Sequence, residues 1–162
     1  QGPGIRGGQD AVVAVATGAV GGFGGAQAGR QSVVALLKGG NPVVRQADDR
    51  SLAQIAEQEQ NLTRKARSNR LTLDEIEGEA IALSNLGAYD IHSFLGIVPP
   101  ATSTILAVGN VIHKVVPIVC GMAARKMMSL TLAVDGRIVD PAYAARFLRD
   151  IAGQLEDPEQ LL

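Results

Sequence analysis

The sequence is poor in aromatic residues, in cysteine and in net charge. Aromatic residues make up 3% of its 162 residues and tryptophan is absent, so stacking platforms for single-stranded nucleic acid are not expected. The formal net charge is −1, which provides no broad basic face for a phosphate backbone. Cys120 is the only cysteine, so no disulfide can form within the chain.

Long apolar runs are also lacking, and none approaches the roughly 20 residues that a membrane-spanning helix needs. The sequence does contain 46% hydrophobic residues, which is enough for a sizeable core, and its length suits one domain. We therefore expect a folded domain whose partners include neither nucleic acid nor a membrane.

Glycine is dense in residues 1–30, where an apolar run over residues 11–16 could form a strand. The stretch GAVGGFGG resembles a phosphate-binding loop. However, no Gly-Lys-Ser/Thr follows it, and no acidic residue stands at the distance that a ribose would need. We therefore predict a glycine-rich arm over residues 1–30 and a core domain over residues 31–162.

The clearest helical pattern covers residues 51–67, where Ser51 and Gln54 form a capping box. A second box, from Thr72 to Glu75, predicts a short helix that ends at Gly78. Extended segments are expected over residues 32–37, 42–45, 104–109 and 111–119, the last of them as an edge strand because Pro117 interrupts it.

The central stretch of the chain is residues 127–141. Alternating apolar residues predict a strand over residues 127–134, and Asp135-Gly136 is a turn dipeptide. Asp140-Pro141 predicts a helix start, with the carboxylate as N-cap and the proline in the first turn. The expected buried stripe of that last helix is Tyr143, Phe147, Leu148, Ile151 and Leu155, and Arg146 and Arg149 are expected to point outward.

This stretch reads D-G-R-I-V-D-P and is similar to the D-H-R-x-x-D-G motif of the dihydrolipoyl acyltransferases, the core subunits of 2-oxo acid dehydrogenase complexes. Four further motifs resemble that family and occur in its order. They are P-V-V-R-Q-A from Pro42, S-N-L-G from Ser84, I-V-P-P from Ile97 and T-I-L-A-V-G from Thr104. The resemblance covers roughly residues 32–162.

The resemblance implies an α+β fold. It would be a two-layer mixed sheet with helices on one face, chloramphenicol acetyltransferase-like and truncated at its N-terminal side. It also implies homotrimers with the active site at the subunit boundary.

Members of this family move an acyl group between coenzyme A and a dihydrolipoyl arm. Their motif histidine is the base for the attacking thiol, and a serine donates to the oxyanion. By motif, Ser84 matches that serine, while Arg137 and Asp140 match the motif arginine and aspartate. Gly136 stands in place of the histidine, so no catalytic residue and no cofactor are expected, and Ser84, Gly136 and Asp140 are vestigial positions.

Three other residues could carry chemistry. His92 and His113 are the only histidines, and each is expected to be a surface or structural residue rather than a relocated base. Cys120 has no basic partner nearby in the sequence and is expected to be an incidental thiol. Asp140 is sufficiently explained as an N-cap, and Ser84 as an inherited strand-end hydroxyl.

We therefore expect a non-catalytic structural subunit, most like the degenerate protein X branch of the family, in the mitochondrial matrix. Its expected partners are further copies of itself, the acyltransferase core and, through regions upstream of this chain, dihydrolipoamide dehydrogenase. Leu161 and Leu162 are expected to anchor it to a neighbour. The alternatives are a divergent active acyltransferase with coenzyme A as substrate, for instance in a bacterial cytoplasm, and an unrelated α+β ligand-binding domain.

Overall fold

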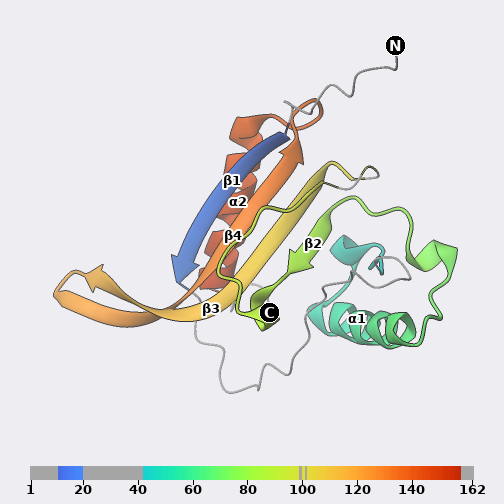
Figure 1. Ribbon diagram of the computed structural model, residues 1–162, viewed down its shortest axis with the longest axis horizontal. Coiled ribbons are helices and arrows are strands. Elements are labelled where there is room, and N and C mark those ends of the chain that lie inside the picture. The colour runs from blue at the N-terminus through green and yellow to red at the C-terminus, as the bar shows by residue number, and fades with distance from the viewer. Residues whose placement is uncertain (1–10, 20–41, 99, 101, 158–162) are drawn as a thin grey trace, which may run out of the picture.

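The computed structural model describes residues 11–19, 42–98, 100 and 102–157. Four strands form one mixed sheet in the order β1-β4-β3-β2 (Figure 1). β4 pairs antiparallel with both β1 and β3, whereas β2 pairs parallel with β3. The strands are β1 (Ala11–Ala19), β2 (Ala82–Asn85), β3 (Thr104–Ile118) and β4 (Gly121–Asp135). The helices are α1 (Leu52–Arg67), α2 (Pro141–Glu156) and the 3-10 turns η1 (Ala47–Asp49), η2 (Leu73–Glu75) and η3 (Gly87–Tyr89).

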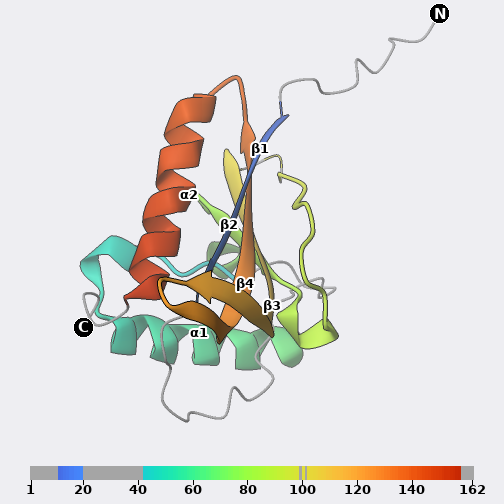
Figure 2. The same ribbon diagram turned by 90° about the vertical axis from the view of Figure 1, so that its left-hand side faces the viewer.

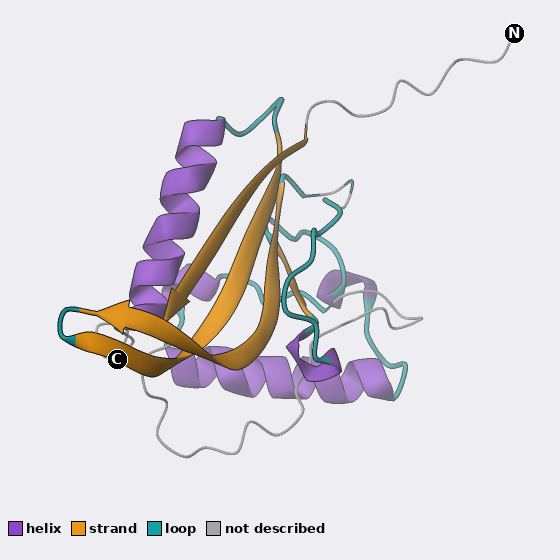
Figure 3. Ribbon diagram, turned by 60° about the vertical axis from the view of Figure 1, so that its left-hand side comes forward, coloured by secondary structure: helices purple, strands orange, loops and turns teal. Residues whose placement is uncertain are grey.

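The strands β3 and β4 form a long hairpin whose outer half projects from the body of the molecule (Figures 1 and 3). The two segments predicted over residues 104–109 and 111–119 are one strand, joined through an irregularity between Val108 and Val111. A bulge of this kind bends a strand without ending it, and it leaves no clear mark in the sequence. Pro117 pairs only with Met122 in the described sheet, which fits the expected edge position.

The helix α2 packs on one face of the sheet, and the apolar core lies between them (Figure 2). The core consists of Leu130, Leu132, Val134, Ala144 and Leu148. Phe147, Ile151 and Leu155 pack against it as predicted, but the prediction for Tyr143 is wrong, because its side chain is 59% exposed. Tyr143 is one residue before Ala144 and therefore points about 100° away from the buried stripe. The predicted fold class is confirmed.

The other face of the sheet is covered by the loop that joins β2 to β3 (Figure 2). A Cβ atom on Gly109 would lie 1.8 Å from the carbonyl oxygen of His92, and one on Gly96 would lie 2.8 Å from Ile105. The backbone N–H of Asn110 donates to the carbonyl of Ile91 at 2.8 Å. Because Gly109 of β3 has no side chain, the loop backbone at His92 can lie directly against the strand.

Helix α1 runs across one end of the sheet rather than over its face (Figures 2 and 3). Its predicted bounds and capping box are confirmed: the backbone N–H of Ser51 donates to Gln54 Oε1, and the N–H of Gln54 donates to Ser51 Oγ. Only Leu62 and Ala66 of this helix are buried. The second predicted box is also present, although the turn it opens is the 3-10 turn η2 and not a longer helix.

Three predictions concern segments that lie wholly or mostly outside the described residues. They are the anchor at Leu161 and Leu162, the strand expected over residues 32–37 and the GAVGGFGG stretch, of which only the first two residues are described, at the end of β1. Residues 11–19 form β1 and pair with β4, where an apolar run over residues 11–16 suggested a strand. The domain boundary at residue 30 stays a prediction. Among the described residues, no helix is long and apolar enough to span a membrane.

Candidate functional site

The corner between β4 and α2 is built around Asp135. Its Oδ1 accepts a hydrogen bond from the backbone N–H of Arg137 at 3.0 Å, and its carbonyl accepts from Ile138 and Val139. The Arg137 guanidinium donates to both carboxylate oxygens, through Nε at 2.9 and 3.2 Å and through Nη2 at 2.6 Å. These bonds from Arg137 lower the pKa of Asp135 to about 2. Asp135 is therefore ionised at neutral pH and is a very weak base there.

Asp140 closes the same corner as the N-cap of α2. Its Oδ2 accepts from the backbone N–H of Tyr143 at 3.0 Å, and Pro141 occupies the first turn. This is the predicted helix start. Gly136 lies between these two carboxylates in the sequence and is exposed. The corner thus has hydrogen-bonded carboxylates and a surface guanidinium, but no imidazole.

Ser84 lies in the middle of β2, half-buried, beside a cavity of about 1380 Å³. We call this space the β2 cavity. It is enclosed by β2 and the segment before it, by the extended segment after Pro42, and by the loop that carries Phe94. Exposed apolar side chains line it, namely Ile81, Leu83, Leu95 and Ile97.

The structure does not bring Ser84 and Gly136 together within one chain. Ser84 is level with Ala107, and Ala107 is level with Thr131 on β4. Gly136 therefore lies two strands across and five residues further along, which separates the two positions by roughly 15 Å or more. A site that used both positions on one reacting group would need a second copy of the chain.

His92 lies on the loop-covered face of the sheet. Its Nε2 is 3.4 Å from the hydroxyl of Ser129, which is 3% exposed. Ser84 and Ser129 lie on the same face of the sheet. Ser84 pairs with Ala107, Ala107 pairs with Thr131, and Ser129 is two residues from Thr131 on a strand whose alternate residues share a face. The sequence holds no signal for the contact of His92 with Ser129, because 37 residues separate them.

His113 and Cys120 lie far out on the β3–β4 hairpin. His113 is exposed and stands opposite Lys126, and Cys120 is exposed at the hairpin tip. No group of three or more potential metal-ligating side chains occurs in the part of the chain that the structure describes.

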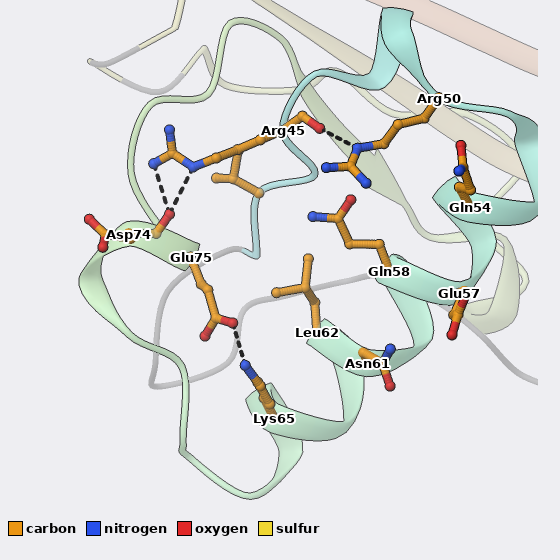
Figure 4. A pocket seen from close by; sticks show the side chains of 11 residues that line it. Arg45, Arg50, Gln54, Glu57, Gln58, Asn61, Leu62, Lys65, Asp74 and Glu75 are labelled. Carbon is orange, nitrogen blue, oxygen red and sulfur yellow. Dashed lines mark hydrogen bonds and ion pairs between the residues drawn. The ribbon is translucent and has the colours of Figure 1, made fainter.

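A second cavity, of about 600 Å³, lies between α1 and η2 (Figure 4). Arg45 spans it and donates to the carbonyl of Asp74 at 2.8 and 3.1 Å and to that of Glu77 at 3.0 Å. Glu75 pairs with Lys65, and this hydrogen bond, together with one from the backbone of Thr72, lowers the pKa of Glu75. Sequence reasoning missed this arrangement, although the P-V-V-R motif contains the arginine. Its visible role is to hold η2 against the segment before α1.

Comparison with known proteins gives a consistent result. The model of the family "2-oxoacid dehydrogenases acyltransferase (catalytic domain)" matches residues 41–162. The chain is 32% identical to the dihydrolipoyllysine-residue acetyltransferase component of the pyruvate dehydrogenase complex of Rickettsia bellii, over 81% of this chain and 32% of that protein. It is 35% identical to component 2 of the mitochondrial complex of Arabidopsis thaliana, over 75% of this chain and 23% of that protein.

Solved structures show the same likeness. A crystal structure of the Azotobacter vinelandii dihydrolipoamide acetyltransferase superposes with a TM-score of 0.70 at 32% identity, over 74% of this chain and 49% of that one. That work concerned a serine, a histidine and an asparagine in the catalytic mechanism. The cubic core of a pyruvate dehydrogenase multienzyme complex gives the same TM-score and coverage. The chain thus spans a third or less of these curated relatives and about half of these solved chains.

Proposed function

Because the chain belongs to the family of 2-oxoacid dehydrogenase acyltransferase catalytic domains, we propose that it is a non-catalytic assembly subunit of such a complex. The observation that carries the proposal is the glycine at position 136. In the Azotobacter enzyme the histidine follows the serine by 52 positions, and the asparagine follows the histidine by four. Gly136 follows Ser84 by 52 positions, and Asp140 follows Gly136 by four. The serine is kept at this spacing and the histidine is not.

The missing imidazole matters because the reaction is a thiol attack on a thioester. An ordinary thiol has a pKa of about 8.5, so only a few per cent is thiolate at neutral pH. A positioned base accelerates such a step by about 10²–10⁴-fold. Glycine has no group that could take the proton.

No neighbouring side chain in the corner replaces the base. Asp135 has a pKa of about 2, and the carboxylate of Asp140 accepts the capping hydrogen bond of α2. Arg137 is bound to Asp135 and is a cation at any working pH. The corner therefore retains the hydrogen bonds that shape it and has no imidazole base.

The names of the relatives support the assignment to such a complex. Those named above are components of pyruvate dehydrogenase complexes, some mitochondrial and some bacterial. We place this chain in such a complex as a subunit similar to protein X, located in the mitochondrial matrix. The alternative location is a bacterial cytoplasm. Its proposed partners are the acyltransferase core and, through upstream regions, dihydrolipoamide dehydrogenase.

The chain is further proposed to form a homotrimer and to dock through Leu161 and Leu162. The separation of Ser84 from Gly136 supports the trimer, since residues inherited from one active site would meet only across a boundary between copies. The exposed apolar residues of the β2 cavity support it too, because they would lose contact with water in such a contact.

One observation favours a second candidate, a divergent but active acyltransferase that uses coenzyme A. His92 lies on the same sheet face as Ser84 and contacts the buried hydroxyl of Ser129. In this alternative His92 would act as the base.

The test measures the rate of acetyl transfer from acetyl coenzyme A to dihydrolipoamide. Three proteins are compared, namely the full chain and its variants His92→Ala and Gly136→His. We expect the full chain and His92→Ala to match the protein-free rate. We also expect Gly136→His not to restore activity, because the chain spans only about half of the solved catalytic chains. Turnover by the full chain that disappears in His92→Ala would establish the second candidate instead.

A further inference from the structure

The cavity of about 600 Å³ between α1 and η2, which we call the α1 cavity, is lined by a polar face of the helix. Residues spaced by three or four positions lie on one face of a helix, and those that face this cavity are Gln54, Gln58, Asn61 and Lys65. Val43 and Leu62 add apolar surface. The volume falls within the range of small-ligand sites.

The side-chain amide of Gln58 is the group of this cavity that most needs a partner. Its Oε1 is buried and accepts no hydrogen bond in the part of the chain that the structure describes. Buried amide oxygens are nearly always hydrogen-bonded, because the bonds to water that they lose on folding are costly to leave unreplaced. The oxygen therefore marks a position that suits an N–H or O–H group of a bound molecule.

The guanidinium of Arg50 is held beside this amide. Its Nε donates to the carbonyl of Arg45 at 2.9 Å, which fixes the orientation of the half-buried side chain. Its two terminal nitrogens have no hydrogen-bond or ion-pair partner among the described residues. The guanidinium of Arg50 and the amide of Gln58 extend into the same space (Figure 4). A carboxylate can accept two parallel hydrogen bonds from such a guanidinium.

The other charges that line the α1 cavity are engaged or turned away. Arg45 donates to two backbone carbonyls, and Lys65 pairs with Glu75. The two remaining carboxylates are exposed and point away from the space between α1 and Arg50 (Figure 4); they are those of Glu57 and Asp74. The charge that faces a bound molecule is therefore the cation of Arg50, and this favours an anion.

We propose that the α1 cavity binds a small carboxylate that has a hydroxyl or ammonium group on the carbon next to the carboxyl. The carboxylate accepts hydrogen bonds from the terminal nitrogens of Arg50, and the neighbouring group donates to Gln58 Oε1. Both 2-hydroxy acids and α-amino acids have this chemistry. Ser84 lines the β2 cavity and not this one, so the inference is independent of the proposed assembly function.

A matched series of ligands tests the assignment. L-lactate and L-alanine have the donor on the carbon next to the carboxyl, and propionate has the same carbon chain without it. The full chain is compared with Gln58→Met and Arg50→Lys, and the control is Gln60→Met, at an exposed position of α1. Circular dichroism confirms folding of each variant. Titrations up to about 50 mM, followed by the NMR shifts of the α1 amides and of the Gln58 side chain, measure millimolar affinities.

We expect lactate, alanine or both to bind the parent chain about tenfold more tightly than propionate, since only they satisfy the buried oxygen. Which of them does so identifies the class of ligand. Gln58→Met should abolish this preference and leave propionate binding unchanged. Arg50→Lys should weaken the binding of all three, because lysine lacks the parallel donors, and Gln60→Met should behave like the parent.

Two results would overturn the inference. Shifts that stay constant with all three ligands would mean that water alone satisfies Gln58. A preference for lactate or alanine that persists in Gln58→Met would place the binding site elsewhere. Neither result would affect the proposed assembly function, which the acetyl-transfer assay tests separately.

Discussion

The two halves of this domain are stabilised in different ways. The half made of β3, β4 and α2 has a continuous apolar core, in which Leu132, Val134 and Leu148 are at most 2% exposed. The half around α1 buries only Leu62 and Ala66 and is joined by polar contacts, chiefly those of Arg45. The difference shows that the second half has little apolar core of its own, and its cavity-lining side chains remain uncovered in the single chain.

The largest difference should appear when one leucine is removed from each half. Leu132→Ala leaves a hole in the main core and should lower the free energy of unfolding by about 3–5 kcal/mol. Leu62→Ala should cost less, about 2–3 kcal/mol, because its surroundings are open to two cavities. Urea unfolding measures both values.

Hydrogen exchange separates the two effects further. In Leu62→Ala we expect faster exchange in α1 with unchanged protection in β3, β4 and α2, since local opening need not involve the whole domain. In Leu132→Ala, protection should fall throughout. Equal loss of protection in both variants would show that the halves unfold as one unit.

A smaller effect is expected from the polar contacts of Arg45. Arg45→Met keeps most of the aliphatic stem and removes the hydrogen bonds to the carbonyls of Asp74 and Glu77. Net contributions of hydrogen bonds suggest a loss of about 1–2 kcal/mol, visible as faster exchange in η2 and α1. Arg146→Met, at an exposed site on α2, is the control and should be near neutral. If both variants behave alike, Arg45 does not hold the second half together.

The smallest effect is the pH dependence at the β4–α2 corner. The folded-state pKa of Asp135 is lowered from 3.8 to about 2, so its bond to Arg137 stabilises the fold above pH 3.8. That contribution is lost as the pH falls from there toward 2. The stability difference between the parent chain and Asp135→Asn should therefore shrink across this window. A difference that stays constant from pH 5 to pH 2 would contradict the role given to this pair.

Local signals predicted much of this structure. Ser51 and Gln54 marked the start of α1, and Asp140 with Pro141 marked that of α2, because caps are set by neighbouring residues. Tyr143 was misplaced, since it lies about 100° around α2 from Ala144, beyond the margin of the buried stripe.

Long-range pairing was not visible in the sequence. The register of β1 against β4 and the contact of His92 with Ser129 join residues far apart in the chain. The bulge that merges two predicted strands into β3 also depends on the partner strand. At the site, the motif comparison matched Gly136 with the histidine position of the family, and the local sequence predicted the N-cap at Asp140. They could not show that Ser84 lies two strands away.

The most direct test of the central claim is the pH dependence of acetyl transfer to dihydrolipoamide between about pH 6 and pH 8, below the pKa of an ordinary thiol. Without a base, the rate follows the thiolate and rises about tenfold per pH unit. We predict this slope for the full chain, with rates equal to those of a protein-free mixture. A rate above the protein-free value that levels off near pH 7, as a histidine base would cause, would contradict the claim that this domain has lost its catalytic function.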